Sequence, residues 1–535
     1  MIRKNKQFSH NVIEEGPPFN CSIFPSVTKC VLHGRESQTL VCDITTLLRS
    51  SSNHSFFPYF MLVAFEGGSI FRAFLLLLSF PLLCTLGFDL RMRFMIFITF
   101  CGLRLKDMDV VARAVLPKFY LEDLNLRVYE VLDSVGSRLV FTSLPRIMVE
   151  GFLKDDLNVE VVQGSELHTI WNGKYFSGFL ATSSGQLLLK KDAALRKHFG
   201  EKKPDLGIAS LTADDLKFIS VCKESYVVTE EDRKPSSTTI MPRKKYPKPL
   251  IFHDGRLAFF PTPFATLKMF IWLPIGLTLG IIRTLAVLLL PHKMSIFVIK
   301  STGLIFKYKI HHQNNQNNPI SPKGKNGGVL YVCNHRTLLD PVFLNLAVQK
   351  PLAALTYSLS RFSEVISPIR TVKLKRDRTQ DAKTIENLLN EGDLVVCPEG
   401  TTCREPYLLR FSSLFAELTD EIVPVAVNTH VTMFYGTTAS GFKWLDHIFF
   451  AINPRPCYSV EVLVKLPREL TVSGGKSSHE VANYIQSKLA DALGFECTNL
   501  TRRDKYLMLA GNEGLVNDDN IPRNVFQWKT GRVKK

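Results

Sequence analysis

Residues 327–343 read GGVLYVCNHRTLLDPVF and contain a histidine and an aspartate, His335 and Asp340, five positions apart. On a helix, five residues turn through about 500°, which leaves the side chains ~140° apart, and on a strand an odd offset places them on opposite faces. The pair can therefore meet only where a strand passes into a helix. Val329–Cys333 predicts that strand, and Asp340 followed by Pro341 is typical of a helix start with Asp340 as N-cap. Such a turn can hold a general base and its orienting carboxylate, but a capping aspartate beside an exposed loop histidine fits the spacing equally well.

Two other segments of the same region carry polar residues at strand ends. Residues 372–382, VKLKRDRTQDA, are densely basic, and residues 394–406, LVVCPEGTTCREP, open an apolar strand into Pro-Glu-Gly-Thr. A glycine beside an acidic residue suits close approach of the backbone to a bound ligand. Taken singly, the first segment is also consistent with a solvated charged face, and the second with a plain strand-to-loop turn. The basic residues are Lys373, Lys375, Arg376 and Arg378.

Apolar runs alternate with helical patterns on both sides of a charged, Pro/Ser/Thr-rich stretch at 230–249, which predicts two α/β blocks with parallel sheets. The runs that predict strands are Leu40–Cys42, Leu139–Thr142, Glu160–Val162 and Val227–Val228 in the first block, and Val329–Cys333, Thr371–Leu374, Leu394–Cys397, Val423–Val427 and Val460–Val464 in the second. We expect an N-terminal segment at 1–36, a first domain at 37–229 with a helical insert at 56–103, a linker at 230–265, a membrane segment at 266–300, a second domain at 301–510 and a basic tail at 511–535.

Two apolar stretches are candidates for membrane contact. Met269–Leu290 has 22 residues and Arg283 as its only charge, and at ~1.5 Å per residue it would extend ~33 Å, enough to span a bilayer core or to form a re-entrant hairpin. The second candidate, Ile70–Phe88 followed by residues 95–102, contains Pro81, which would kink a helix. A long buried core helix and a buried helical cap are the alternatives.

The composition of the chain narrows its partners. The 535 residues carry 45% hydrophobic side chains and a net charge of +17, which excludes wholesale disorder and favours an anionic partner. No basic run is interleaved with aromatic residues, so nucleic acid is not expected. The eleven cysteines contain no CxxC pair and follow a polar start, and we interpret them as reduced thiols facing the cytosol.

Together, in this order and spacing, the segments of the second block resemble the glycerolipid acyltransferase family that contains the bacterial 1-acylglycerol-phosphate acyltransferases, the PlsC-like enzymes. The family pattern is NHxxxxD, an arginine at a strand end, xPEGT, and an apolar strand ending in proline, and the resemblance covers roughly residues 300–510. The matching residues are Asn334, His335, Asp340, Arg376, Pro398, Glu399, Gly400, Thr401 and Pro424. The variant CPEGTTCREP resembles the land-plant glycerol-3-phosphate acyltransferases associated with cutin and suberin. One departure is Thr402, where many relatives carry an arginine; Arg404 follows two residues later.

The resemblance implies transfer of a fatty acyl group from acyl-CoA to glycerol 3-phosphate, at sn-2 as in the cutin-type relatives, with lysophosphatidic acid and CoA as products. His335, oriented by Asp340, would take the proton of the attacking hydroxyl. Arg376, Glu399, Gly400 and Thr401, with Arg404 as a further candidate, would hold the glycerol phosphate. The resemblance implies no metal, no cofactor besides acyl-CoA as co-substrate, and no covalent enzyme intermediate. It also implies the endoplasmic reticulum membrane with the active site facing the cytosol, with a mitochondrial membrane as the alternative; the oligomeric state is left open.

The front half resembles the haloacid-dehalogenase-like (HAD-like) phosphatase domain of the cutin-type members. Their DxDGT motif corresponds to LVCDITTLLRSSS at 40–52, where either Cys42 and Ile44 or Asp43 alone stand at the aspartate positions. Thr142 matches the second phosphatase motif. The lysine motif is matched by Lys190 or Lys191, whereas GDxxxD is not matched, because Asp214 and Asp215 are displaced. We therefore expect Asp43 to be a capping carboxylate and the domain to have neither Mg²⁺ nor phosphatase activity.

The predicted architecture is α/β: an N-terminal HAD-like Rossmannoid domain and a C-terminal PlsC-type αβ acyltransferase domain, with membrane-embedded helices. Two alternatives to the acyltransferase are a catalytically weak lipid-binding scaffold and a bifunctional acyltransferase–phosphatase that yields monoacylglycerol. The intact His335/Asp340 pair argues against the scaffold, and the loss of a phosphatase carboxylate argues against the bifunctional enzyme. Too few stretches of spanning length exist for a multi-span transporter.

Overall fold

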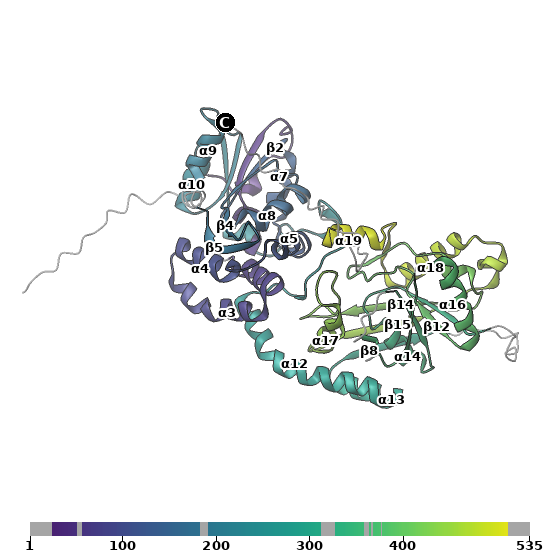
Figure 1. The fold of residues 1–535 in the computed structure, drawn as a ribbon. Helices are drawn as coiled ribbons and strands as arrows, with labels where there is room; N and C mark the ends of the chain where they lie inside the picture. The colour runs from purple at the N-terminus through teal and green to yellow at the C-terminus, as the bar shows by residue number, and fades with distance from the viewer. Residues whose placement is uncertain are drawn as a thin grey trace, which may run out of the picture. The chain divides into compact units, whose positions relative to one another are not determined.

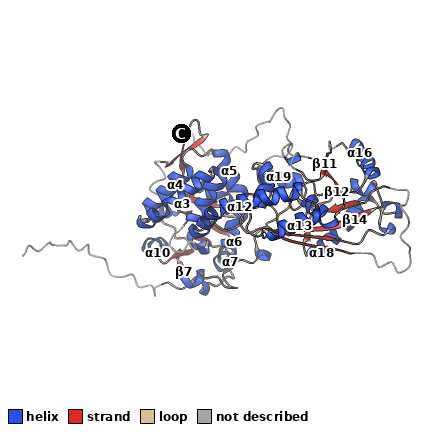
Figure 2. Cartoon of the chain, turned by 90° about the horizontal axis from the view of Figure 1, so that it is seen from below, coloured by secondary structure: helices blue, strands red, loops and turns tan. Residues whose placement is uncertain are grey.

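The computed structural model describes residues 24–50, 56–181, 191–311, 327–357, 363–364, 367–375 and 377–511. These residues form two compact units, drawn in Figure 1 and Figure 2, which divide between Pro249 and Leu250. Two short pieces of the front half, Phe65–Ser69 and Arg113–Val115, belong to the second unit. Both units contain a sheet flanked by helices, as the alternation of apolar runs and helical patterns predicts.

The first unit is built on a five-stranded sheet in the order β3-β2-β1-β6-β7, and every neighbouring pair is parallel. The strands are β1 (Thr39–Asp43), β2 (Ser137–Thr142), β3 (Val161–Gly164), β6 (Leu206–Ser210) and β7 (Glu224–Val228). Strand β1 lies in the centre and is buried along nearly its whole length, which explains its continuous apolar run. Strand β6 was not predicted, since its sequence LGIAS is short and interrupted by a glycine.

Helices surround this sheet, and a helical insert follows the first strand. The helices of the unit are α1 (Ile44–Leu47), α2 (Phe57–Leu62), α3 (Ile70–Thr85), α4 (Phe88–Phe100), α5 (Leu105–Ala114), α6 (Leu116–Asp123), α7 (Leu126–Ser134), α8 (Arg146–Gly151), α9 (Lys191–Phe199), α10 (Ala213–Ile219) and α11 (Glu230–Arg233). An antiparallel hairpin of β4 (Leu167–Ile170) and β5 (Tyr175–Leu180) packs on α4. Helix α3 continues through Pro81.

The second unit contains a seven-stranded sheet in the order β11-β10-β12-β9-β14-β15-β8, parallel except between β14 and β15. The strands are β8 (Ile305–Ile310), β9 (Leu330–Cys333), β10 (Ala353–Thr356), β11 (Arg370–Lys373), β12 (Leu394–Val396), β14 (Ile422–His430) and β15 (Cys457–Val462). Strand β9 lies between β12 and β14, with Val332 opposite Val396 and Pro424. Its carboxyl end is therefore a central position, at the edge where ligands bind in open α/β sheets.

The remaining elements of this unit cover the sheet or extend it. They are α12 (Pro263–Leu289), α13 (His292–Ser301), α14 (Asp340–Val348), α16 (Arg378–Glu391), α17 (Asp446–Ala451), α18 (Ser478–Leu493), α19 (Arg502–Ala510), and the paired short strands β13 (Tyr407–Leu408) and β16 (Glu496–Cys497). Buried side chains of β9, α16 and α18 meet in one core cluster. Side chains of β9, α14 and β15 meet in another, so α14 and α18 lie against the sheet.

The expected linker at 230–265 is not a simple exposed connection. Arg233 is buried and donates to the Thr45 and Leu48 carbonyls within the first unit. His253 and Asp254 are also buried, within the second unit. The sequence reading was wrong here because it judged these residues by their charge, whereas charged groups can be buried when they find partners.

Among the described residues, α12 is the one helix long and apolar enough to cross a membrane. One of its faces packs on α17: a Cβ at Gly276 would lie 2.7 Å from the Ile452 carbonyl, and Trp272 donates to that oxygen at 2.8 Å. The buried positions of the helix are Thr266, Met269, Gly276, Gly280, Arg283 and Ala286. Arg283 donates to the Ala451 and Asn453 carbonyls at 2.6 and 2.7 Å. The one charge of the apolar stretch Met269–Leu290 therefore holds this helix on its own unit.

Candidate active site

The His335–Asp340 pair forms in the turn between β9 and α14, as the spacing predicts. His335 Nδ1 lies 2.8 Å from Asp340 Oδ2, and the Asp340 carboxylate is fully buried. The backbone amides of Arg336 and Thr337 donate to the same carboxylate at 2.7 and 3.1 Å. Helix α14 begins at Asp340, and Leu339 is its N-cap. The sequence predicted Asp340 as the N-cap, so this prediction was wrong by one position.

The electrostatics of the turn favour a charged imidazole. Burial alone would lower the pKa of His335, but contacts with the Cys397 thiol and the Asp340 carboxylate outweigh burial and raise this pKa above its ordinary value. Asp340 therefore stabilises the imidazolium that forms when the ring takes a proton. This is the arrangement of a general base with its orienting carboxylate.

Two further side chains hold the turn, and one of them was not predicted. Asn334 forms paired hydrogen bonds with the Val427 backbone, at 2.8 and 2.7 Å, and so fixes β9 to β14. The Tyr458 hydroxyl donates to Asp340, and the Tyr458 ring stacks on Phe343 with the ring centroids 3.8 Å apart. Tyr458 lies 118 residues from Asp340 in the chain, and no local pattern marks it.

Glu399 lies behind the turn, within hydrogen-bonding distance of the backbone on either side. Its two carboxylate oxygens accept from the backbone amides of His335, at 2.7 Å, and Leu409, at 3.0 Å. Burial raises the pKa of Glu399 to about 7, although both amides favour the charged form. These contacts make Glu399 a positioning residue for His335, whereas the sequence predicted a substrate contact.

Gly400 and Thr401 differ in where they lie. Gly400 lines the pocket beside His335 and has a φ of +67°. Residues with a side chain rarely adopt this left-handed backbone conformation, so the position favours glycine. Thr401 faces Lys505 of α19, whose Nζ lies 3.4 Å from the Thr401 hydroxyl and 2.6 Å from the Thr402 carbonyl. Lys505 is a buried cation beside Thr402, where many relatives carry an arginine, and sequence reasoning did not find it.

Two arginines, Arg376 and Arg404, were predicted to bind phosphate, and the structure describes only Arg404. Arg404 is buried and donates to the Gly255 and Thr437 carbonyls, and its guanidinium lies 3.3 Å from the Asp254 carboxylate. These partners occupy Arg404 in the fold, so the structure does not support the predicted phosphate contact. Arg376 lies outside the described residues, and its neighbour Arg378 pairs with Glu417.

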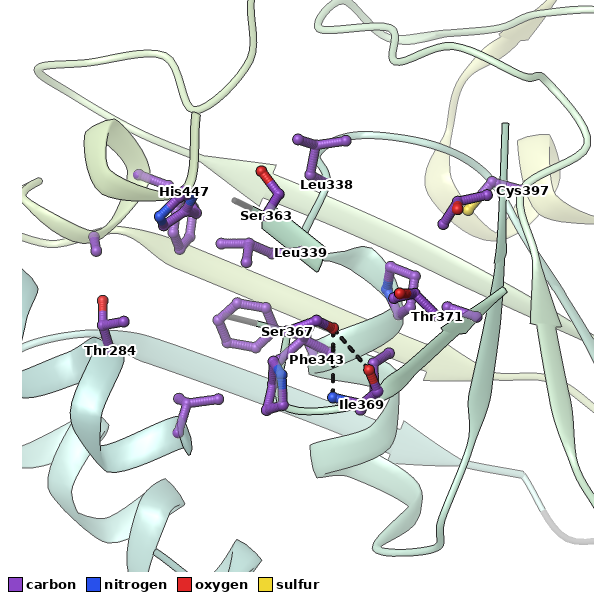
Figure 3. Close-up of a pocket in the computed structure, with 18 of the residues that line it drawn as sticks. Thr284, Leu338, Leu339, Phe343, Ser363, Ser367, Ile369, Thr371, Cys397 and His447 are labelled. Atoms are coloured by element: carbon purple, nitrogen blue, oxygen red, sulfur yellow. Dashed lines mark hydrogen bonds between the residues drawn. The ribbon is translucent and has the colours of Figure 1, made fainter. Parts of the chain in front are cut away.

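An apolar pocket opens from the His335 turn toward α12 and α13. Figure 3 shows its wall, with Cys397 on one side of the view and Thr284 of α12 on the other, and Leu339 and Phe343 between them. His335 and Gly400 also line the pocket. The other apolar wall residues include Val287, Leu288, Ile299, Leu304, Val342 and Ile369. A pocket of this composition suits a hydrocarbon chain whose reactive end reaches the histidine.

The first unit contains a second polar cluster at the carboxyl end of its central strand. Asp43 accepts from the Thr45 amide at 2.8 Å, which is the predicted capping contact. Asp43 and Asp215 lie 2.7 and 2.9 Å from the ammonium of Lys191. The sequence reading was wrong to treat Asp215 as displaced, since α10 brings it to the cluster, while Lys190 lies outside the described residues.

The HAD-like family implies Mg²⁺, and the residues of this cluster do not fit it. Two carboxylates share one ammonium, and the Thr45 carbonyl accepts from the Arg233 guanidinium at 2.8 Å. The DxDGT pattern has its second carboxylate two residues after Asp43, where this chain has Thr45. The GDxxxD pattern has its first carboxylate four residues before Asp215, where this chain has Leu211. Mg²⁺ prefers a nearly octahedral set of oxygens that are free to bind it. Here cationic side chains occupy Asp43 Oδ2, Asp215 Oδ1 and the Thr45 carbonyl, which leaves Asp215 Oδ2 as a single unpartnered carboxylate oxygen, too few for such a set.

The fold and the two polar clusters define a class: an acyltransferase-type α/β domain joined to a HAD-like domain. Residues 39–228 match the family "Glycerol-3-phosphate acyltransferase RAM2-like, HAD-like domain", and residues 307–428 match the family "Acyltransferase". The chain is 56% identical to "Glycerol-3-phosphate acyltransferase 1" of Arabidopsis thaliana, over 92% of this chain and 87% of that one. It is 48% identical to "Glycerol-3-phosphate acyltransferase RAM2" of Petunia hybrida, over 89% and 97%. The chain belongs to the plant glycerol-3-phosphate acyltransferase family, which confirms the resemblance and the two-domain fold.

Among solved structures, the chain is similar to the 1-acyl-sn-glycerophosphate acyltransferase PlsC of Thermotoga maritima. The identity is 14% and the TM-score 0.26, over 43% of this chain and 97% of that one.

Proposed function

We propose that this protein transfers a fatty acyl group from acyl-CoA to glycerol 3-phosphate and forms lysophosphatidic acid, at the sn-2 position. The observation that carries the proposal is the His335–Asp340 pair at the wall of an apolar pocket. The names of its relatives support the glycerol 3-phosphate part of the proposal.

In the proposed reaction, the acyl chain lies in the pocket with its thioester carbonyl beside His335. The imidazole removes the proton of the glycerol hydroxyl as that oxygen attacks the carbonyl, and CoA leaves as the thiol. Asp340 keeps Nδ1 occupied, so that Nε2 is the nitrogen that takes the proton. General-base help of this kind contributes about 10²–10⁴-fold in rate. We assign the phosphate contact to Arg376 with the backbone at Gly400.

The test is an acyl-CoA assay on microsomes that contain the full chain, with the regiochemistry of the product determined. We expect His335→Ala to lose about 10²–10⁴-fold of the rate and the wild-type product to carry the acyl group at sn-2. A His335→Ala protein that acylates glycerol 3-phosphate at the wild-type rate would sink the mechanism. An sn-1 product would refute the regiochemistry alone.

We further propose that the reaction stops at lysophosphatidic acid. The support is the poor fit of the Asp43 cluster to Mg²⁺ described above, together with Thr45 at a carboxylate position of the phosphatase pattern. Purified protein given lysophosphatidic acid and Mg²⁺ is expected to release no inorganic phosphate. Clear Mg²⁺-dependent release would instead favour the bifunctional alternative.

We place the protein at the endoplasmic reticulum membrane, with the active site facing the cytosol. The support is an exposed apolar stripe on α12 opposite its packed face, and three exposed lysines of α12 and α13, Lys268, Lys293 and Lys300, that suit anionic headgroups. The exposed residues are Phe264, Leu267, Ile271, Ile275, Ile281 and Leu285. Replacing Ile271 and Ile275 with serine is expected to shift the protein from the membrane pellet to the soluble fraction. Unchanged pelleting with wild-type activity would argue against this surface.

A further inference from the structure

Two thiols lie side by side at the catalytic turn, and the proposed reaction uses neither. Cys333 ends β9 and Cys397 directly follows β12. Because these strands are parallel neighbours with Val332 opposite Val396, the next residue of each is also adjacent. Their sulfur atoms are 3.2 Å apart; Cys333 is fully buried and Cys397 reaches the pocket wall (Figure 3).

The histidine beside these thiols is oriented as metal-binding histidines are. His335 Nδ1 is paired with a carboxylate, so Nε2 is the nitrogen that would bind a cation once it has given up its proton. In metal sites the same carboxylate–histidine pairing fixes the ring and increases its strength as a ligand. Ligand atoms of His335, Asp340 and Cys397 all lie within 4.8 Å of one another.

We propose that Cys333, Cys397 and His335 form an inhibitory site for a thiophilic divalent cation of the Zn²⁺ type. Two sulfurs and one imidazole nitrogen are a ligand set that zinc takes up, with a fourth position left for water. Zn–S bonds of about 2.3 Å and Zn–N bonds of about 2.0 Å place ligand atoms of one tetrahedral ion about 3.5–3.8 Å apart. The sulfur–sulfur distance of 3.2 Å requires a shift of a few tenths of an ångström, and the spacing of at most 4.8 Å between ligand atoms of Cys397 and His335 requires a shift of a little over one. Mg²⁺ and Ca²⁺, which prefer oxygen ligands, do not match this set.

The inhibition follows from the nitrogen that the cation occupies. A cation on Nε2 removes the lone pair that would accept the proton of the glycerol hydroxyl, so acyl transfer stops while the fold remains. This consequence rests on the proposed function. Binding of the cation does not depend on that function, so the two can be tested separately.

The first test measures acyl transfer by the full chain as ZnCl₂ is added in a buffer without chelator. We expect at least tenfold inhibition that EDTA reverses. Cys333→Ser is expected to require at least tenfold more zinc for the same inhibition. Cys457→Ser, which removes a cysteine of β15 outside the cluster, serves as the matched control and is expected to respond as the wild type does. Equal zinc sensitivity of wild type and Cys333→Ser would overturn the proposal.

The second test requires no activity and uses Co²⁺ as a probe of the same ligands. Wild-type protein is expected to show the charge-transfer absorption of cobalt bound to thiolates, and addition of Zn²⁺ is expected to abolish it. Cys397→Ser and Cys333→Ser are each expected to weaken the absorption, whereas Cys457→Ser keeps it. If the cobalt signal is absent, or equal in all four proteins, the site does not exist. If the wild-type protein gives the cobalt signal but shows no acyl transfer in the absence of metal, the proposed function is refuted and the proposed metal site stands.

Discussion

The two polar clusters of this protein are built alike and differ in the cation that pairs with the carboxylate. Asp43 and Asp340 each lie at or just beyond the carboxyl end of a central parallel strand, are fully buried, and accept from a backbone amide of their own turn. Asp340 pairs with an imidazole, the side chain best suited to exchange a proton, and raises its pKa together with the Cys397 thiol. Asp43 pairs with Lys191, whose pKa is lowered by burial but raised overall by Asp43 and Asp215. In the proposed reaction the Asp340 cluster takes up a proton, whereas the Asp43 cluster is an ion pair of two carboxylates with one ammonium.

The largest effect on acyl transfer is expected from a substitution at Asp340, the carboxylate that pairs with His335. Asp340→Asn keeps an oxygen for the Thr337 amide but removes the charge that stabilises the imidazolium. We expect kcat to fall by about 10²–10⁴-fold with little change in KM, measured with saturating acyl-CoA. Asp43→Asn is the matched change in the other cluster, and acyl transfer per folded protein is expected to stay at the wild-type level. Equal losses in both variants would contradict the division of roles.

A third carboxylate–cation pair, Asp254 with Arg404, extends the comparison, because it stabilises the fold and has no part in the proposed reaction. Burial would raise the pKa of Asp254, but Arg404 and hydrogen bonds from Ser440 and the Ala439 amide lower it to about 2. A lowered pKa stabilises the fold above the ordinary value of 3.8, and this stability is lost as the pH falls from about 4 to 2.

Asp254→Asn is therefore expected to cost about 3 kcal/mol in the free energy of unfolding at neutral pH, since it leaves Arg404 buried with one partner fewer. The acid-induced loss of stability between pH 4 and 2 should become shallower, which unfolding in denaturant across that range would measure. Asp491→Asn, which removes an exposed carboxylate of α18, is the control. An unaltered acid profile in Asp254→Asn would show that this pair does not link proton binding to folding.

A smaller effect is expected at Glu399, where positioning and substrate binding predict different kinetics. Glu399→Gln turns an amide group toward one of the two backbone amides that the carboxylate now accepts from. We expect a loss of about 1–3 kcal/mol in stability and about a tenfold lower kcat, with an unchanged KM for glycerol 3-phosphate. A raised KM with an unchanged kcat would restore the substrate contact that the sequence predicted.

The sequence predicted the parts of the site that lie close together in the chain. The offset between His335 and Asp340 required a strand-to-helix turn, and five predicted strands of the second unit are present. Tyr458 and Lys505 were not found, because Tyr458 reaches Asp340 and Lys505 reaches Thr401 and Thr402 from distant elements, and neither lies in a recognisable pattern. Arg404 was assigned to substrate from its place after Pro-Glu-Gly-Thr. Its actual partner, Asp254, lies 150 residues away, beyond what local spacing can indicate.

The smallest effect is expected from repairing a single position of the first unit's cluster. Thr45→Asp restores a carboxylate of the phosphatase pattern, but the Arg233 guanidinium still holds the carbonyl of residue 45 and Leu211 still replaces a second carboxylate. We therefore expect no Mg²⁺-dependent phosphate release from lysophosphatidic acid and no change in acyl transfer. The triple variant Thr45→Asp, Leu211→Asp, Arg233→Ala frees the carbonyl and adds both carboxylates, so it is the informative companion. Phosphate release by Thr45→Asp alone would mean that the cluster is one residue from activity, and that its ion pairs yield to Mg²⁺.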